Sequence, residues 1–404
     1  MEMRLMTQQL IKDSNMKLLY ASIYNQPGIS RTLLSKKTRL SKTTVSTLVD
    51  ELIERQFIMD SGASPNSDTV GRKSNLLYAR SGSYYVTVLH WEGNAVHLHM
   101  VDIAGGPVYR ETHLLGEEDT YLSVSREFFY HSFIKKFAAE KILGVCIVVS
   151  AMIDAAREEV YSTTLSLPSL DKENLFQKLQ SAFPGYAVAF LEDTACCAYA
   201  EKIYANIKEK NFAFINFSHG IGATLFIEGN MLGKASGAFT QFGHYSVDPQ
   251  GPLCICGNRG CLEALISEYH LKERIASTGN IRCLDHLETI TFSDLGQAAL
   301  YKDPQVLKLL SQMAYELALA LGNLICTVNP SLIILGGKIP SLGTYFLEEV
   351  RKNMEHIGFR RMVDHVDIRY STLNSDSFLS GAMKYFFDTY YCYTSDMHSG
   401  FFVG

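Results

Sequence analysis

One short stretch constrains the folding of this chain more than any other, because it carries a histidine and three cysteines among glycines and prolines. Residues 243–267 read GHYSVDPQGPLCICGNRGCLEALIS. His244, Cys254, Cys256 and Cys261 have the composition of a metal site, and the residues after Cys261 have the pattern of a helix. A loop that binds a metal through four side chains must keep one shape. The stretch therefore predicts a metal loop.

Beyond residue 84, short apolar runs alternate with longer helical patterns. The runs that we expect to form strands are residues 85–89, 95–102, 142–149, 212–217, 223–228 and 332–335. Strands that alternate with helices are typical of an α/β fold. Glycines follow some of these runs, as in Gly220-Ile221-Gly222, but tight turns also use such glycines, so they indicate phosphate binding only weakly.

Charge is distributed unevenly along the chain, whose formal net charge is -5. Residues 1–80 carry 12 basic and 7 acidic side chains, or +5, and the other 324 residues carry 25 basic and 35 acidic side chains, or -10. A basic segment on an acidic body favours a polyanion as the partner of that segment alone. A charged surface without a partner is the alternative interpretation.

Two short helices are predicted inside the basic segment. The first begins after Ser30, and the second, residues 41–55, has Ser41 as its N-cap. An apolar stripe at helical spacing in the second helix consists of Val45, Leu48, Val49, Leu52 and Ile53. The polar residues at its outward N-terminal end are Ser41, Lys42, Thr43, Thr44, Ser46 and Thr47. Because short hydroxyl side chains and a helix N-terminus suit phosphates and base edges, we expect these residues to contact duplex DNA.

A hairpin is predicted directly after these helices. Residues 57–60 and 74–78 have the pattern of its two strands, and the polar loop between them ends in Gly71-Arg72-Lys73. A basic loop tip beside a helix-turn-helix is how a wing reaches an adjacent groove of DNA. We therefore predict a winged helix-turn-helix domain over residues 1–80, with Arg72 and Lys73 as further DNA contacts. A plain three-helix bundle is the alternative.

The cysteine count and the apolar runs bear on the compartment. Nine cysteines cannot all pair within one chain, and the six outside the metal loop lie in apolar or irregular surroundings, as buried thiols do in a reducing compartment. We expect no membrane-spanning run and no signal peptide, so the predicted location is the cytoplasm.

Together these features resemble the ROK family, named for its repressors, open reading frames and sugar kinases. The likeness covers nearly the whole chain, and the metal loop is its most specific part. The family pattern is matched at Gly243-His244, Val247-Asp248-Pro249, Gly251-Pro252, Cys254, Cys256-Gly257, Gly260 and Cys261-Leu262-Glu263. Supporting matches are Asn329-Pro330 before residues 333–337, and Gly381-Ala382. The winged helix resembles the repressor branch, since the kinases of the family lack such a domain.

The resemblance implies a two-lobed, actin-like and hexokinase-like α/β body with ligand held in the cleft between its lobes. We expect a first lobe over residues 81–195, with a C-terminal helix at about 376–392 packing back on it, and a second lobe over residues 196–375 that contains the metal loop, 244–261. A homodimer or a dimer of dimers is the expected assembly. Three thiolates and one imidazole suit tetrahedral Zn²⁺, and because they fill all four positions the zinc is expected to be structural. A redox-active cysteine group is the less favoured alternative.

The two phosphate loops of the family kinases are matched poorly. The first, Asp-x-Gly-Gly-Thr, falls on residues 90–94, where one glycine remains and Glu92 would face ATP phosphates with like charge. The second falls on residues 218–222, where it is half retained. We therefore expect that ATP binding, and with it sugar kinase activity, has been lost.

The sugar-binding residues implied by the resemblance are better retained. Glu192-Asp193 occupies the place of the family's catalytic Asn-Asp, so Asp193 would be the base of a kinase and a hydroxyl-binding acceptor in a sensor. A helix-capping role is the alternative for Asp193. Gln241 stands where the family has glutamate, and His244 and Glu263 are kept. These residues are expected to line a cleft for a sugar or a related metabolite.

Three functions are weighed on these grounds. The favoured one is a DNA-binding transcriptional regulator, and more specifically a repressor of carbohydrate genes, whose body senses a sugar. The second is an ATP-dependent sugar kinase with an added DNA-binding domain. The third is a body without a small ligand, serving only dimerisation or docking.

Overall fold

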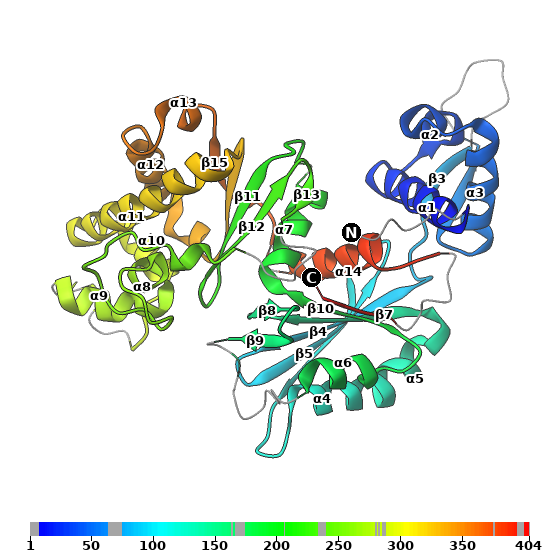
Figure 1. Cartoon of the computed structure of the whole chain (residues 1–404), viewed down its shortest axis with the longest axis horizontal. Helices are drawn as coiled ribbons and strands as arrows, with labels where there is room; N and C mark the ends of the chain where they lie inside the picture. Colours follow the sequence, from blue (N-terminus) through cyan, green and yellow to red (C-terminus); the bar gives the residue numbers. More distant parts are fainter. Residues whose placement is uncertain are drawn as a thin grey trace. The chain divides into compact units, whose positions relative to one another are not determined.

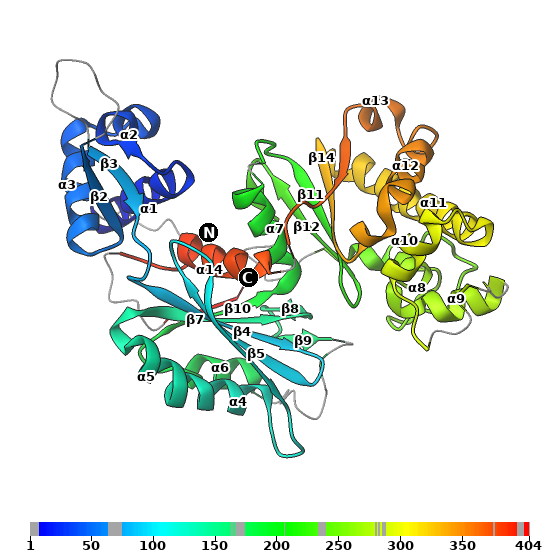
Figure 2. The same ribbon diagram turned by 180° about the vertical axis from the view of Figure 1, so that it is seen from behind.

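The structure is a computed structural model of the 404-residue chain, shown from two sides in Figures 1 and 2. It describes residues 8–63, 75–162, 165, 174–205, 207–232, 240–278, 281, 283–284, 288–374, 376–393 and 400–403. The chain divides into two compact units. Unit 1 consists of Met1–Ala151, Glu158–Ile203 and Asp376–Val403, and unit 2 mainly of Met152–Arg157 and Tyr204–Ser375.

The N-terminal part of unit 1 has three helices and a small sheet. In chain order the elements are α1 (Gln8–Asn25), β1 (Ile29–Ser30), α2 (Arg31–Thr38), α3 (Lys42–Glu54), β2 (Ile58–Ala63) and β3 (Asn75–Ala79), and the sheet order is β1-β3-β2. Both predicted N-caps are confirmed, because Ser30 Oγ accepts from Leu33 N and Ser41 Oγ accepts from Thr44 N. The predicted hairpin is confirmed as the antiparallel pair of β2 and β3. Arg72 and Lys73 lie outside the described residues.

The body of unit 1 is built on a six-stranded sheet of order β16-β10-β7-β4-β5-β6. Its strands are β4 (Tyr85–Glu92), β5 (Ala95–Asp102), β6 (Pro107–Leu114), β7 (Ile142–Val149), β10 (Ala187–Glu192) and β16 (Phe401–Val403). The helices α4 (Tyr121–Phe128), α5 (Ile134–Phe137) and α6 (Leu175–Ala182) cover one face, and α14 (Ser377–Thr389) lies on the other (Figure 1). Because both faces are covered, β7 is buried along its whole length and has no alternation of polar residues.

Unit 2 is built on a five-stranded sheet of order β13-β12-β11-β14-β15. Its strands are β11 (Phe212–Phe217), β12 (Ile221–Ile227), β13 (Asn230–Met231), β14 (Leu332–Gly337) and β15 (Asp367–Tyr370). Its helices are α8 (Leu262–Ile266), α9 (Leu271–Thr278), α10 (Phe292–Leu300), α11 (Pro304–Val328), α12 (Gly343–Met354) and α13 (Arg360–Val363). Alternate residues of β11, such as Ala213 and Ile215, share one apolar core with α11. The two remaining strands are β8 (Met152–Asp154) and β9 (Glu159–Tyr161), and α7 (Asp193–Tyr204) follows β10.

Each predicted strand exists, but three differ in length from the prediction. β4 extends to Glu92, beyond residue 89, and β14 extends to Gly337, beyond residue 335. β12 spans Ile221–Ile227, where 223–228 was predicted. The added residues are paired with a neighbouring strand, as Glu92 is with Ala95. Pairing with a neighbour therefore sets these ends, beyond what the local pattern indicates.

Two expectations drawn from the sequence were wrong in detail. By length and composition α11 is apolar enough to span a membrane, although no such run was expected. Most of that helix is buried in the core of unit 2, which explains its composition without a membrane. Two cysteines expected to be buried, Cys283 and Cys326, are exposed, whereas Cys146 and Cys196 are buried.

Candidate metal centre and ligand-binding residues

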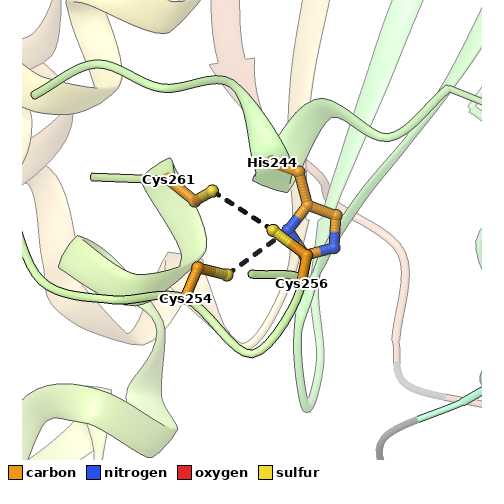
Figure 3. A group of neighbouring side chains, drawn as sticks. All are labelled: His244, Cys254, Cys256 and Cys261. Carbon is orange, nitrogen blue, oxygen red and sulfur yellow. Dashed lines mark hydrogen bonds between the residues drawn. The ribbon is translucent and has the colours of Figure 1, made fainter. Parts of the chain in front are cut away.

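The four predicted metal ligands converge in unit 2. The donor atoms of His244, Cys254, Cys256 and Cys261 all lie within 4.8 Å of one another (Figure 3). Cys254 Sγ is 3.6 Å from His244 Nδ1, and Cys256 Sγ is 3.6 Å from Cys261 Sγ. Zinc–sulfur bonds of about 2.3 Å in a tetrahedron put two sulfurs about 3.8 Å apart. The donor set and its spacing therefore fit a zinc ion.

The backbone of the loop explains why these side chains meet. Cys254 N donates to Asn258 O over 2.7 Å, and Gly257 N donates to Cys254 O over 2.9 Å, so the chain turns sharply between the cysteines. Gly260 has a φ of +60°, and a Cβ there would lie 1.6 Å from Asp248 O. Only glycine fits at that position. Cys261 occupies the N-cap position of α8 without a side-chain capping bond, and its sulfur lies toward Cys256 (Figure 3).

The electrostatics of the thiols also favour a cation. Burial and the neighbouring cysteines raise the pKa of Cys261 to about 12. Burial likewise raises the pKa of Cys254. Thiolates crowded in one partly buried place repel one another, and a divalent cation reverses that effect by stabilising each thiolate.

The loop positions two of the predicted sugar-binding residues beside the turn between β11 and β12. His244 ends a 3-10 helix, Phe242–His244, and a Cβ on Gly243 would lie 2.4 Å from Ile221 O, so this helix packs closely on β12. Glu263, in the first turn of α8, accepts a hydrogen bond from Ile221 N over 2.8 Å. A Cβ on Gly220 would lie 2.4 Å from Glu263 Oε2. The loop thus holds His244 and Glu263 next to residues 220–221, at the turn between β11 and β12.

Gln241 behaves differently from its neighbours. It is exposed and directly precedes the 3-10 helix, and its carbonyl accepts from His244 N over 3.0 Å. Its backbone therefore supports the position of His244, while its side chain faces solvent in unit 2.

Glu192 and Asp193 lie in unit 1, at the junction of β10 and α7. Glu192 is buried, whereas Asp193 is half-buried as the first residue of α7. Asp193 Oδ2 accepts from Ser150 Oγ over 2.6 Å, and Asp193 Oδ1 accepts from Thr194 N. The second bond comes from the adjacent residue, so it is not the bond of an N-cap, and the first ties the carboxylate to Ser150, directly after β7. Ser150 was missed from the sequence because nothing near it in the chain marks it as a partner of Asp193.

Residues 90–94, the position of the first phosphate loop, form the tight hairpin between β4 and β5. Trp91 is fully buried, with Nε1 donating to Ser125 Oγ over 3.0 Å. Glu92 Oε2 lies 3.7 Å from His97 Nε2 and 4.0 Å from His90 Nδ1. An indole and a carboxylate beside two imidazoles thus occupy this hairpin.

The predicted DNA-contacting residues of α3 divide into two groups. Lys42, Thr43 and Thr47 are exposed. Ser41 and Thr44 use their hydroxyls on each other at 2.8 Å as part of the N-cap.

Ser46 is also exposed, and its hydroxyl accepts from Arg31 Nη1 over 3.2 Å. Arg31 in turn pairs with Asp50 at 2.7 Å, so it fixes α2 against the exposed face of α3. Lys36, Lys37 and Arg39 are exposed at the turn between these helices. Their adjacency in the sequence was the signal that could have added them to the predicted contacts.

The chain is similar in sequence and structure to known proteins. The ROK family model matches residues 129–388. Because this is well over half of the chain, the chain belongs to the ROK family.

Three similar proteins show that the chain resembles both regulators and a sugar kinase of this family. The xylose repressor of Bacillus spizizenii is 25% identical over 377 residues, covering 92% of this chain and 94% of that protein. A solved ROK family transcriptional regulator, described as a homologue of the E. coli Mlc protein, matches with a TM-score of 0.77 and 22% identity over 93% of this chain and 95% of its own. The glucokinase of Halalkalibacterium halodurans is 30% identical over 184 residues, covering 43% of this chain and 54% of that protein. The α/β body is thus a ROK sugar-kinase-like fold, and the two regulators match more of the whole chain than the glucokinase does.

Proposed function

We propose that this protein is a DNA-binding transcriptional repressor that responds to a sugar, and that it does not phosphorylate that sugar. The observation on which this depends is the exposed polar end of α3 in a small helix and hairpin unit joined to a ROK body. The xylose repressor similarity extends over both parts of the chain and supports this combination. D-xylose is therefore the first effector to test, as a pentose with several hydroxyl groups.

For the DNA interface we propose a winged helix-turn-helix over residues 1–80. In this interpretation α3 lies in the major groove, with Lys42, Thr43, Ser46 and Thr47 near bases and phosphates, and Arg72 and Lys73 reach an adjacent groove. The closeness of α2 to α3 and the antiparallel pair of β2 and β3 support it. A symmetric dimer would present two such helices to one operator.

For the effector we propose that Glu192, Asp193, Gln241, His244 and Glu263 take part in binding its hydroxyl groups. Carboxylates accept hydroxyl protons strongly, and hydrogen bonds already orient the half-buried Asp193 and Glu263. We further propose that Zn²⁺ is the metal of the loop and that its role is structural. When bound, it would fix the position of His244 directly, and that of Glu263 through the nearby ligand Cys261.

One feature argues against a kinase. Residues 90–94, where the resemblance places the first phosphate loop, hold Trp91 and Glu92, and the Glu92 carboxylate would meet ATP phosphates with like charge. A cytoplasmic location is proposed as well, in keeping with a repressor acting on genomic DNA.

The test uses the full-length protein and a DNA duplex selected from a random library by that protein. We expect its affinity for the duplex to fall steeply with salt concentration, and to change by about 5- to 150-fold when D-xylose is added. A panel of other monosaccharides and amino sugars follows if D-xylose has no effect. Failure to select any duplex, or ATP-dependent phosphorylation of a sugar by the purified protein, would contradict the proposal.

A further inference from the structure

The most unusual buried group outside the sites described above is the ammonium of Lys384 on α14. Its side chain is 1% exposed, and Nζ lies 2.5 Å from Asp388 Oδ1 one turn further along the helix. Nζ also lies 4.8 Å from the ring centroid of Tyr24 and 5.5 Å from that of Tyr20, both on α1. A buried cation is costly unless it is paired, and here it is stabilised by one carboxylate and two aromatic rings of the N-terminal segment.

Asp388 is connected on its other side to α7. Tyr199 Oη donates to Asp388 Oδ2 over 2.8 Å, so one carboxylate joins Tyr199 and Lys384. The two helices also pack with their backbones close together. A Cβ on Gly381 of α14 would lie 2.1 Å from the Cys196 carbonyl of α7, so only glycine permits this approach.

The same helix, α7, begins at Asp193, which is proposed above to bind the effector. Tyr199 lies less than two turns further along it. A helix is rigid over this length, so a movement of Asp193 is transmitted to Tyr199 with little loss.

The end of α14 contacts the N-terminal segment at further points. The ring of Phe387 lies 5.0 Å from that of Tyr20, and the amide of Tyr393 donates to Asp13 on α1. Arg55 Nη1, directly after α3, donates to Tyr393 O over 2.8 Å. A displacement of α14 therefore acts on both α1 and the C-terminal end of the proposed recognition helix.

We propose that Tyr199, Asp388 and Lys384 form the connection through which the effector, bound at the start of α7, changes the position of the DNA-binding segment. This inference rests on the proposed function. All of its residues belong to unit 1. The three are positioning residues, because none of them is proposed to contact the sugar or the DNA. Effector binding acts by favouring one position of α7, and the half-buried Asp388 carboxylate and the buried Lys384 ammonium pass that preference on to α1.

The main variant is Tyr199→Phe, which removes one oxygen and leaves the ring. Its matched control is Tyr186→Phe, which also removes one tyrosine hydroxyl of unit 1, there bonded to Ala139 O over 3.3 Å. The second variant is Lys384→Met. Its control is Lys136→Met, which removes an ammonium 3.8 Å from the ring centroid of Tyr109, away from α14. All four are made in the full-length chain.

The first experiment measures two quantities for each variant. Calorimetry gives its affinity for D-xylose, and its affinity for the duplex is measured with and without D-xylose. We expect Tyr199→Phe to bind D-xylose within about twofold of the wild type, while its D-xylose-dependent change in duplex affinity shrinks from about 5- to 150-fold to below about twofold. The control keeps the full change. A Tyr199→Phe protein that responds like the wild type overturns the connection. A wild-type protein that binds DNA and responds to no sugar contradicts the proposed function instead.

The second measurement needs no ligand, so it tests the connection whichever sugar is the effector. Amide hydrogen exchange of α1 is followed in the free proteins. Loss of one hydrogen bond corresponds to about 2- to 13-fold faster exchange, and we expect this acceleration in α1 for both Tyr199→Phe and Lys384→Met. Acceleration limited to α7 and α14, with α1 exchanging as in the wild type and the controls, overturns the proposal.

Discussion

The metal loop and the aromatic contacts around α14 both hold a functional segment in place, but they are assembled from very different parts of the chain. The contacting metal ligands are 10 and 5 residues apart in the sequence. Around α14, by contrast, Asp13 meets Tyr393 across 380 residues and Arg55 meets Tyr393 across 338. The loop can close early and locally, because short loops cost little entropy, whereas the α14 contacts exist only when unit 1 has folded. Local chemistry therefore secures His244 and Glu263, and global folding secures the proposed DNA-binding segment.

The largest effect is expected when the metal loop is disrupted. Cys254→Ala removes one of the four proposed metal ligands and should abolish metal binding. Structural zinc sites have apparent binding free energies of about 10–16 kcal/mol in small peptides, so the loop should lose its shape. Elemental analysis and thermal unfolding check this against Cys326→Ala, which removes an exposed cysteine outside the cluster. A wild-type protein that is fully folded and metal-free would refute the structural role of the ion.

The next largest effect is expected when a contact between the N-terminal segment and the region around α14 is removed. Phe57, directly after α3, is 1% exposed and its ring lies 4.5 Å from Tyr84 and 4.9 Å from Tyr393. Phe57→Ala should lower the free energy of unfolding by about 3–5 kcal/mol, since it leaves a cavity between the N-terminal segment and α14. Urea unfolding measures the loss, and Phe359→Ala, at an exposed ring, should cost far less. If the metal content also falls, the two regions are not independent.

Acidification should act on unit 1 through His99 of β5. Burial, together with His90, His97 and Arg110, lowers the pKa of His99 to about 4, against 6.5 for a free imidazole. Between these values the unfolded chain binds a proton that the folded chain does not, so stability falls as the pH drops from about 6.5 to about 4. The loss amounts to about 3 kcal/mol.

The check on this prediction compares His99→Leu with the wild type, since acid also protonates the metal ligands in both proteins. Urea unfolding is measured at several pH values, and the difference between the two free energies should change across this window. A constant difference from pH 7 to pH 4 would mean that His99 titrates normally.

The smallest effect is expected at the DNA surface. Lys42→Ala removes an exposed charge from the first turn of α3. If Lys42 contacts a phosphate, duplex affinity should fall similarly for all sequences, and the slope of log affinity against log salt should decrease by about 1. Fluorescence anisotropy across a salt series measures both quantities, with Lys136→Ala as a control on the body of unit 1. An unchanged slope would place Lys42 away from the DNA backbone.

Much of the fold was predictable because its signals are local. Ser30 and Ser41 cap helices through bonds to residues three positions away, and the strand patterns reflect burial of single segments. The composition of α11 is shared by core helices and membrane helices, and its burial in the core of unit 2 is what tells the two apart. The surroundings of Asp193 could not be predicted, since Ser150 is 43 residues away in the chain.

The sequence by itself determined the metal loop, since the ligands, the turn and the glycine at position 260 lie in one segment whose chemistry admits few arrangements. Only the tertiary structure decided the contacts that Tyr199, Lys384 and Tyr393 make. Each is an ordinary residue in its own segment, and the aromatic C-terminal segment is equally compatible with a core helix or a partner-binding surface. Burial of Lys384 beside Asp388 and Tyr24 gives these residues their role. A side chain's effective chemistry depends on the neighbours that exclude water from it, and those neighbours come from distant parts of the chain.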